Sequence, residues 1–282
     1  MIASRPGSGR SCPGPDRVVI VSTAPLVAFA LLLFDRAAHR NVRSGTPSDI
    51  PARCPVDQVR RIHHPANRKL TNIMTTPMTA TTFSDPAPAQ RLERAAMALT
   101  AHGFSVEILD DAAAARARTT DLIPEGASVF TGASETLRLS GIEEDLNASG
   151  RYDAIKPRTL AMDRATEADE IRRLRASPDV SVGSVHALTE TGSLVVASGS
   201  GSQLPGYAGG AARAIWVVGA QKVVPDLSTA LRRVEDHCLP LEDARSRAAY
   251  GWPSAVTRLL ILNAEFQPGR GTVLLLREAI GF

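Results

Sequence analysis

Cysteine and aromatic residues are scarce in this 282-residue sequence. The three cysteines, Cys12, Cys54 and Cys238, include no pair with the close spacing of a zinc, iron–sulphur or dithiol redox site. They also provide no disulfide framework, which favours a reducing, cytoplasmic location. Because Phe, Tyr and Trp make up only 4% of the chain, the core must be built from Leu, Val, Ile and Ala.

Several motifs that bind nucleotides or carry nucleophiles are also missing. The sequence has no GxxxxGK[ST] phosphate loop and no GxSxG nucleophile elbow. The segment GSGSQLPG lacks the third glycine of a dinucleotide fingerprint, because Leu204 stands at that position. We therefore expect no cofactor and no metal ion on this chain.

Basic charge is confined to the first part of the sequence. Residues 1–77 carry eleven Lys/Arg and four Asp/Glu, whereas residues 78–282 carry 21 and 25. The pI near 9.0 therefore reflects the first segment, and the acidic remainder gives no support for a nucleic-acid partner. We predict a Pro/Arg-rich leader over residues 1–77 and a single globular domain over residues 78–282.

One apolar run, Val18–Phe34, interrupts the leader. Its length is typical of a signal-peptide core or a marginal membrane span, yet no clean cleavage site follows it. Met74 and Met78 stand just before the first regular pattern, so the leader is also compatible with an upstream start without a structural role. We favour that interpretation over a membrane anchor or an export signal.

From Ser84 onward, helical and strand patterns alternate. The expected strands are Phe104–Leu109, Ala127–Thr131, Val180–Gly183, Leu194–Ala197, Ile215–Val218, Leu259–Leu262 and Thr272–Leu276. Helices are expected from Ser84 or Asp85 to Gly103, from Asp110 or Asp111 to about Leu122, from Ser134 to Gly150, over Arg164–Ala176, near Leu227–His237 and near Leu241–Ala249. This alternation predicts a three-layer α/β fold, a mostly parallel sheet with helices on both faces.

The stretch between Asp179 and Asp226 holds most of the functional signals. Its two apolar strands enclose a segment with five glycines, whose backbone amides could approach a ligand closely. His186 stands four residues before Glu190, a spacing that fits either an acid–base or metal pair or a simple hydrogen-bonded histidine. Tyr207 could close over a ligand or serve as a packing anchor.

Three segments, HALTETGSLVV, AIWVVGAQKVVPDLSTAL and YGWPSAV, together resemble the LUD (lactate-utilisation) domain family of the protein C type. The resemblance covers residues 90–282. It implies the fold of the sugar-phosphate isomerase and CoA-transferase superfamily. It also implies a bacterial protein of L-lactate use that acts with iron–sulphur partners.

The resemblance carries over to individual positions. Its ETG motif corresponds to Glu190, Thr191 and Gly192, its lysine to Lys222, and its Gly-Pro-Ser only in part to Trp252, Pro253 and Ser254. The superfamily implies Glu190 as a catalytic carboxylate nucleophile, whereas the structural alternative is that Glu190 only fixes its own turn. The predicted ligand-binding residues are Gly192, Ser193, Gly199, Gly201, Lys222 and Ser254. Lys222 either steadies an anionic ligand or is simply solvated.

Two functions follow from these residues. The first is an accessory or subunit role in L-lactate oxidation, in which the chain binds a small anionic metabolite or an iron–sulphur partner and has no redox centre of its own. The second is a CoA-transferase-like or sugar-phosphate enzyme that uses Glu190. The sequence does not decide whether the chain is an enzyme, and it is compatible with a homo-oligomer. We expect no membrane partner.

Overall fold

The computed structural model describes residues 83–282, so the predictions for the leader and its apolar run lie outside the described residues. The chain divides into two units, Met1–Thr71 and Asn72–Phe282, and the description below concerns the second. Within residues 83–282, no helix has the length and apolar character needed to cross a bilayer.

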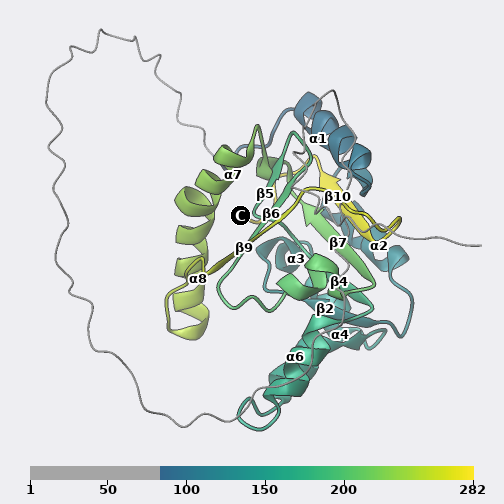
Figure 1. Ribbon diagram of the computed structural model, residues 1–282, viewed down its shortest axis with the longest axis vertical. Coiled ribbons are helices and arrows are strands. Elements are labelled where there is room, and N and C mark those ends of the chain that lie inside the picture. Colours follow the sequence, from purple (N-terminus) through teal and green to yellow (C-terminus); the bar gives the residue numbers. More distant parts are fainter. Residues whose placement is uncertain (1–82) are drawn as a thin grey trace, which may run out of the picture. The chain divides into compact units, whose positions relative to one another are not determined.

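A parallel sheet of six strands forms the centre of this unit (Figure 1). Its strand order is β1-β10-β7-β4-β2-β3, and every neighbouring pair is parallel. The strands are β1 (Ser105–Leu109), β10 (Gly271–Leu276), β7 (Arg213–Val218), β4 (Val180–Gly183), β2 (Ser128–Thr131) and β3 (Asp153–Ala154).

Both faces of this sheet are buried, as the continuous apolar runs of its strands predict. Side chains alternate along β7, so that Trp216 and Val218 pack in one core cluster and Ile215 and Val217 in another. Helix α1 (Ala89–Ala101) covers the first face through Leu92 and Leu99. Helices α2 (Ala112–Leu122), α3 (Glu135–Leu139) and α4 (Ile142–Ala148) contribute to the core on the second face. The predicted three-layer α/β fold is therefore confirmed.

A second sheet was not predicted as a separate element. Its strand order is β8-β5-β6-β9, and it comprises β8 (Val223–Val224), β5 (Ala187–Thr189), β6 (Leu194–Ser198) and β9 (Arg258–Leu262). Strand β6 is antiparallel to both β5 and β9. Leu194 and Val196 of β6 join the core under α1, while Val195 and Ala197 face helix α7 (Leu227–Arg233). An apolar run therefore identified these strands but not the sheet to which they belong.

Several helix predictions were wrong in their boundaries. The first helix begins at Ala89, not at Ser84, with Pro88 at its N-cap. The helix expected from Ser134 to Gly150 is instead two helices, α3 and α4, because Gly141 adopts a left-handed φ of 76° between them. Ser134 does cap α3, since its hydroxyl accepts a hydrogen bond from the backbone N–H of Leu137.

The segment around Pro157, where no helix was expected, forms helix α5 (Ile155–Ala161), in which the proline occupies the first turn, where a missing N–H costs little. Helix α6 (Ala168–Ala176) follows, and it begins at Ala168 instead of the expected Arg164. The two helices expected between Leu227 and Ala249 are one helical run. It comprises α7, the π-helix η3 (Val234–Cys238) and α8 (Leu239–Tyr250), and Pro240 stands in the first turn of α8.

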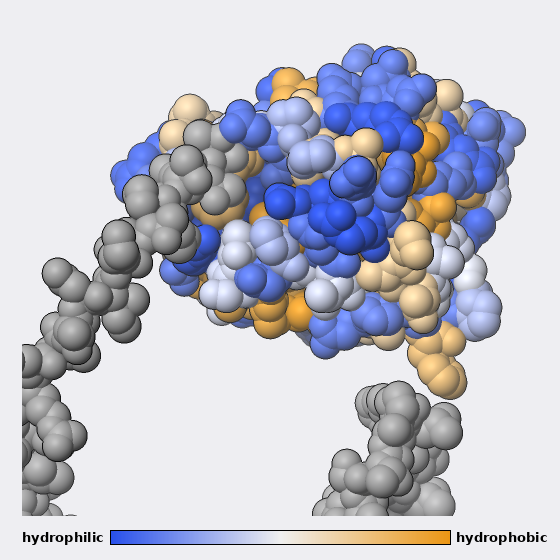
Figure 2. Space-filling model, turned by 90° about the horizontal axis from the view of Figure 1, so that it is seen from above, coloured by the Kyte–Doolittle hydropathy of each residue, from blue (hydrophilic) through white to orange (hydrophobic). Residues whose placement is uncertain are grey.

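The surface seen in Figure 2 is mostly hydrophilic, with its apolar residues scattered. Large exposed apolar side chains such as Met97 and Phe266 lie on different elements, while Tyr250 and Trp252 stack on each other. Single apolar residues of this kind are normal on a soluble domain and indicate no docking site by themselves.

Candidate functional site

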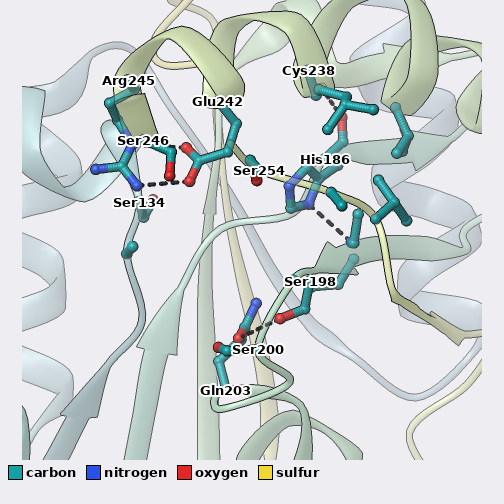
Figure 3. Close-up of a pocket in the computed structure, with 18 of the residues that line it drawn as sticks. Ser134, His186, Ser198, Ser200, Gln203, Cys238, Glu242, Arg245, Ser246 and Ser254 are labelled. Carbon is teal, nitrogen blue, oxygen red and sulfur yellow. Dashed lines mark hydrogen bonds and ion pairs between the residues drawn. The ribbon is translucent and has the colours of Figure 1, made fainter. Parts of the chain in front are cut away.

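A cavity of about 530 Å³ lies at the carboxyl ends of strands β2, β4 and β7 (Figure 3). The strands are neighbours in register, since Thr131 pairs with Val182 and Val182 pairs with Ile215. Segments that leave these strands therefore meet at one edge of the sheet, which is where ligands bind in open α/β folds. The glycine-rich loop after β6 and helix α8 provide the remaining walls.

Lys222 lines this cavity although only 1% of its surface is exposed. It ends the 3₁₀ helix η2 (Ala220–Lys222) that follows β7. Its Nζ donates hydrogen bonds to Thr136 Oγ1 at 2.8 Å and to Ser184 Oγ at 3.0 Å. The lysine is therefore buried and held, so the alternative of a merely solvated side chain is wrong.

Within the described residues, no carboxylate forms an ion pair with Lys222. Among the ion pairs of residues 83–282, none includes Lys222 or the equally buried Arg233. Burial, and then the charge of Arg233, lower the pKa of Lys222 to about 7. The guanidinium group of Arg233 donates hydrogen bonds to the carbonyl oxygens of Phe83, His186 and Gln221 and to Cys238 Sγ. Glu135 and Glu242 also line the cavity, each in an ion pair with an arginine, whereas Lys222 has no ion-pair partner among residues 83–282. The protonated amine of Lys222 therefore favours an anionic ligand.

His186 also lines the cavity, and its hydrogen bonding fixes its tautomer. Its Nδ1 accepts a hydrogen bond from the backbone N–H of Ala197 at 3.1 Å, so the proton of the neutral ring lies on Nε2. Burial, followed by the charges of Lys222 and Arg233, lowers the pKa of His186 to about 3. At neutral pH the ring is therefore an uncharged donor through Nε2–H, and this confirms a hydrogen-bonded histidine.

The pair of His186 with Glu190 does not form. Glu190 lies in the turn after β5, outside the lining of the cavity, with its side chain 16% exposed. Its carboxylate accepts from Arg91 Nε at 2.6 Å and from Arg94 at 2.7 Å, both on α1. The placement favours a structural tie between α1 and the second sheet, while the catalytic role of Glu190 stays a prediction.

The other predicted residues divide between two places. Gly199, Lys222 and Ser254 line the cavity, whereas Gly192, Ser193 and Gly201 do not. Gly192 has a φ of 82° and packs so close to Ala98 that an added Cβ would lie 2.8 Å from its carbonyl carbon. Ser193 Oγ donates to Asn263 Oδ1 at 2.9 Å. The ETG turn therefore packs against α1, and Ser193 contacts Asn263 just beyond β9, away from the cavity.

The glycine-rich loop forms one wall through side chains as well as backbone. Ser198 Oγ donates to Gln203 Oε1 at 3.0 Å and accepts from the Gly201 N–H at 2.8 Å. The Gly201 amide is thus already paired within the loop and is not a free donor for an anion. Figure 3 shows Ser198, Ser200 and Gln203 together, apart from Glu242 and Arg245 of α8.

Helix α8 supplies a charged and aromatic rim. Glu242 and Arg245 form an ion pair at 2.6 Å, and Tyr250 stacks on Trp252 with ring centroids 5.8 Å apart. Ser254 follows this rim, and its backbone N–H donates to Asp243 Oδ1. Arg245 and Glu242 neutralise each other, and the two exposed rings are uncharged. This rim therefore bounds the cavity without adding an uncompensated charge.

Tyr207 is a packing anchor, and its side chain also lines the cavity. It is 2% exposed, packs edge-on against Trp216 and lines the cavity. Its hydroxyl lies where Gly183 has no side chain, since a Cβ there would be 1.6 Å from that oxygen. Gly183 at the end of β4 is therefore required for Tyr207 to take this position.

Three residues that act on Lys222 were not predicted. Ser184 directly follows β4, and its place at a strand end was a usable signal. Thr136 and Arg233 come from helices α3 and α7, and no local pattern distinguishes them from other helical polar residues. Lys222 meets Ser184 from 38 residues away in the sequence and Thr136 from 86 residues away, so only the tertiary structure brings the amine and its hydroxyl partners together.

The polar groups of the cavity suit a small organic anion better than a metal ion. Lys222, the His186 ring and several serine hydroxyls can donate hydrogen bonds to carboxylate oxygens. Within residues 83–282, no group of three or more His, Cys, Asp or Glu side chains could hold a metal ion.

Comparison with known proteins gives a family. The sequence model described as "LUD domain" matches residues 92–250. No curated protein matches the chain. A solved structure described as a DUF162 family protein from Deinococcus radiodurans is similar over 67% of this chain and 97% of that chain, with 14% sequence identity and a TM-score of 0.41. Because the matched region spans more than half of the sequence, the chain belongs to the LUD domain family.

Proposed function

We propose that this protein binds a small carboxylate in the cavity beyond β2, β4 and β7, in an accessory or subunit role in L-lactate oxidation. The observation that carries the binding proposal is Lys222, a buried amine in the cavity wall without a carboxylate partner among the described residues. A bound anion would stabilise the protonated amine and raise the pKa of Lys222. The Nε2–H of His186 would supply a second, uncharged donor.

Calorimetric titration of the full chain with L-lactate, pyruvate and other short carboxylates tests the binding proposal. We expect Lys222→Met to weaken binding about 10- to 100-fold, because a charge-assisted hydrogen bond contributes about 1.5–3 kcal/mol. Lys156→Met is the matched control, since Lys156 pairs with Glu143 and does not line the cavity. Absence of binding by the wild type, or equal binding by Lys222→Met, would overturn the proposal.

The lactate role is supported by membership of a family named for lactate utilisation. The sequence adds that electrons must be carried elsewhere, because it has no flavin, nicotinamide or iron–sulphur motif. The protein would therefore act beside iron–sulphur proteins, which perform the oxidation, while this chain holds the acid or docks a subunit.

The alternative is a thioester or sugar-phosphate enzyme that acts through Glu190. The geometry favours it less, because two arginines already engage this carboxylate and the cavity lies elsewhere. Trapping with hydroxylamine after incubation with acyl-CoA compounds discriminates between the two, since only the alternative expects a labelled Glu190.

A further inference from the structure

Lys222 is surrounded by groups that suit a neutral amine. Ser184 Oγ donates its own proton to the carbonyl oxygen of Val217 at 2.6 Å, and Thr136 Oγ1 donates to that of Ile280 at 3.3 Å. Both hydroxyls therefore present lone pairs, not protons, to Nζ. A neutral amine has two N–H groups and one lone pair, so the two hydroxyls satisfy its donors and leave the lone pair free.

The protonated form is less well matched. An ammonium group has three N–H donors, and Nζ has two hydrogen-bond acceptors among the described residues. Burial and the nearby Arg233 lower the pKa of Lys222 to about 7, so both forms are populated at neutral pH. A free, deprotonated amine in a cavity is the form in which lysine attacks carbonyl carbons.

We propose that Lys222 captures a small 2-oxo carboxylate covalently, as an imine between Nζ and the ketone carbon. This inference rests on the proposed carboxylate site and specifies its ligand class. The keto group supplies the electrophile, and the serine hydroxyls of the cavity lining can donate hydrogen bonds to the carboxylate. His186 lines the same cavity, and its Nε2–H is suited to donate to the carbonyl oxygen and polarise it.

The step balances without an oxidant or a second reactant. The Nζ lone pair attacks the ketone carbon while one amine proton moves to the ketone oxygen, which gives a carbinolamine. Departure of that oxygen as water with the second amine proton forms the C=N bond. The step involves no net oxidation or reduction. L-Lactate, which has a hydroxyl in place of the ketone, binds the same cavity without forming this bond.

Because the chain has few lysines, an imine trapped by reduction can be assigned to a single residue. The sequence has three lysines, Lys69, Lys156 and Lys222. The full chain is incubated with pyruvate, reduced with borohydride, and analysed by intact mass and peptide mapping. We expect one reduced pyruvate adduct per chain, on Lys222, and none when L-lactate replaces pyruvate. Adduct formation should increase as the pH rises through about 7.

Two variants separate this inference from the proposed function. Lys222→Arg keeps a cation but lacks a nucleophilic amine, so we expect it to lose the adduct and still bind pyruvate in calorimetry. Lys156→Met should leave both adduct and binding unchanged. Wild type that binds pyruvate but forms no adduct on Lys222 would overturn the imine and leave carboxylate binding intact. Labelling of Lys69 or Lys156 to the same extent would also overturn the imine, whereas absence of both binding and adduct would overturn both proposals.

Discussion

Lys222 contributes to the dependence of this protein's stability on pH above neutrality. Its pKa falls from 10.5 to about 7 on folding, chiefly because burial disfavours the charged amine. Between these values the unfolded chain binds more protons than the folded one, so the free energy of unfolding rises with pH across this window. Below about pH 7 both states are protonated, and the full cost of burying the charge is present.

A comparison with Lys222→Met isolates this contribution. We expect the free energy of unfolding of the wild type to increase relative to that of the variant as the pH rises from about 7 to about 10, by at most about 1.4 kcal/mol per pH unit. Urea denaturation at several pH values measures it. If the free energies of unfolding of the two proteins changed with pH in parallel, the pKa of Lys222 would not be lowered by folding.

His186 shows how a residue can be flagged by sequence and explained only by structure. Its four-residue spacing from Glu190 suggested an acid–base pair, but the intervening strand β5 and its turn separate the two side chains. The ring instead accepts from Ala197 of the neighbouring strand β6. Spacing along the chain could not reveal this partner, because it depends on the pairing of β5 with β6.

At the scale of elements, the Glu190 turn joins helix α1 to the second sheet. The carboxylate bridges Arg91 and Arg94, and Gly192 lets the turn approach the backbone of α1. His102 Nδ1, just beyond α1, adds a contact at 3.2 Å to the Gly192 carbonyl oxygen. These contacts give the residues of the ETG motif a structural role that requires no catalytic function.

We therefore expect Glu190→Gln to lower the free energy of unfolding by on the order of 1 kcal/mol, between the values typical of exposed and buried ion pairs. Carboxylate binding in the cavity should not change. Glu93→Gln is the matched control, since Glu93 is exposed on the same helix and belongs to none of the ion pairs found in residues 83–282. If Glu190→Gln lost carboxylate binding while its stability was unchanged, Glu190 would have a role in ligand binding and not a purely structural one.

At the scale of the whole molecule, the proposed role requires partners. Oxidation of lactate needs an electron acceptor, and the sequence contains no motif for one. We expect the tagged full chain, expressed in its native host, to co-purify with iron–sulphur proteins, with the tag alone as the control. The purified chain should not turn over lactate by itself. Independent oxidation of lactate by this chain would contradict the subunit role.

The sequence by itself determined the α/β class, the parallel core strands and the family. These features depend on local patterns: apolar runs of strand length, helix caps such as Asp111, and short motifs with fixed spacing. Buried strands need apolar side chains on both faces, so five of the six strands of the central sheet were evident from their apolar runs, whereas the two-residue strand β3 was not.

Only the tertiary structure decided where the candidate site lies. Thr136, Ser184 and Lys222 come from three separate segments and meet because the carboxyl ends of β2, β4 and β7 are neighbours in the sheet. The order of strands, the second sheet and the burial of an amine without a carboxylate are long-range properties. No local pattern encodes them, because burial and charge balance depend on which distant segments pack together.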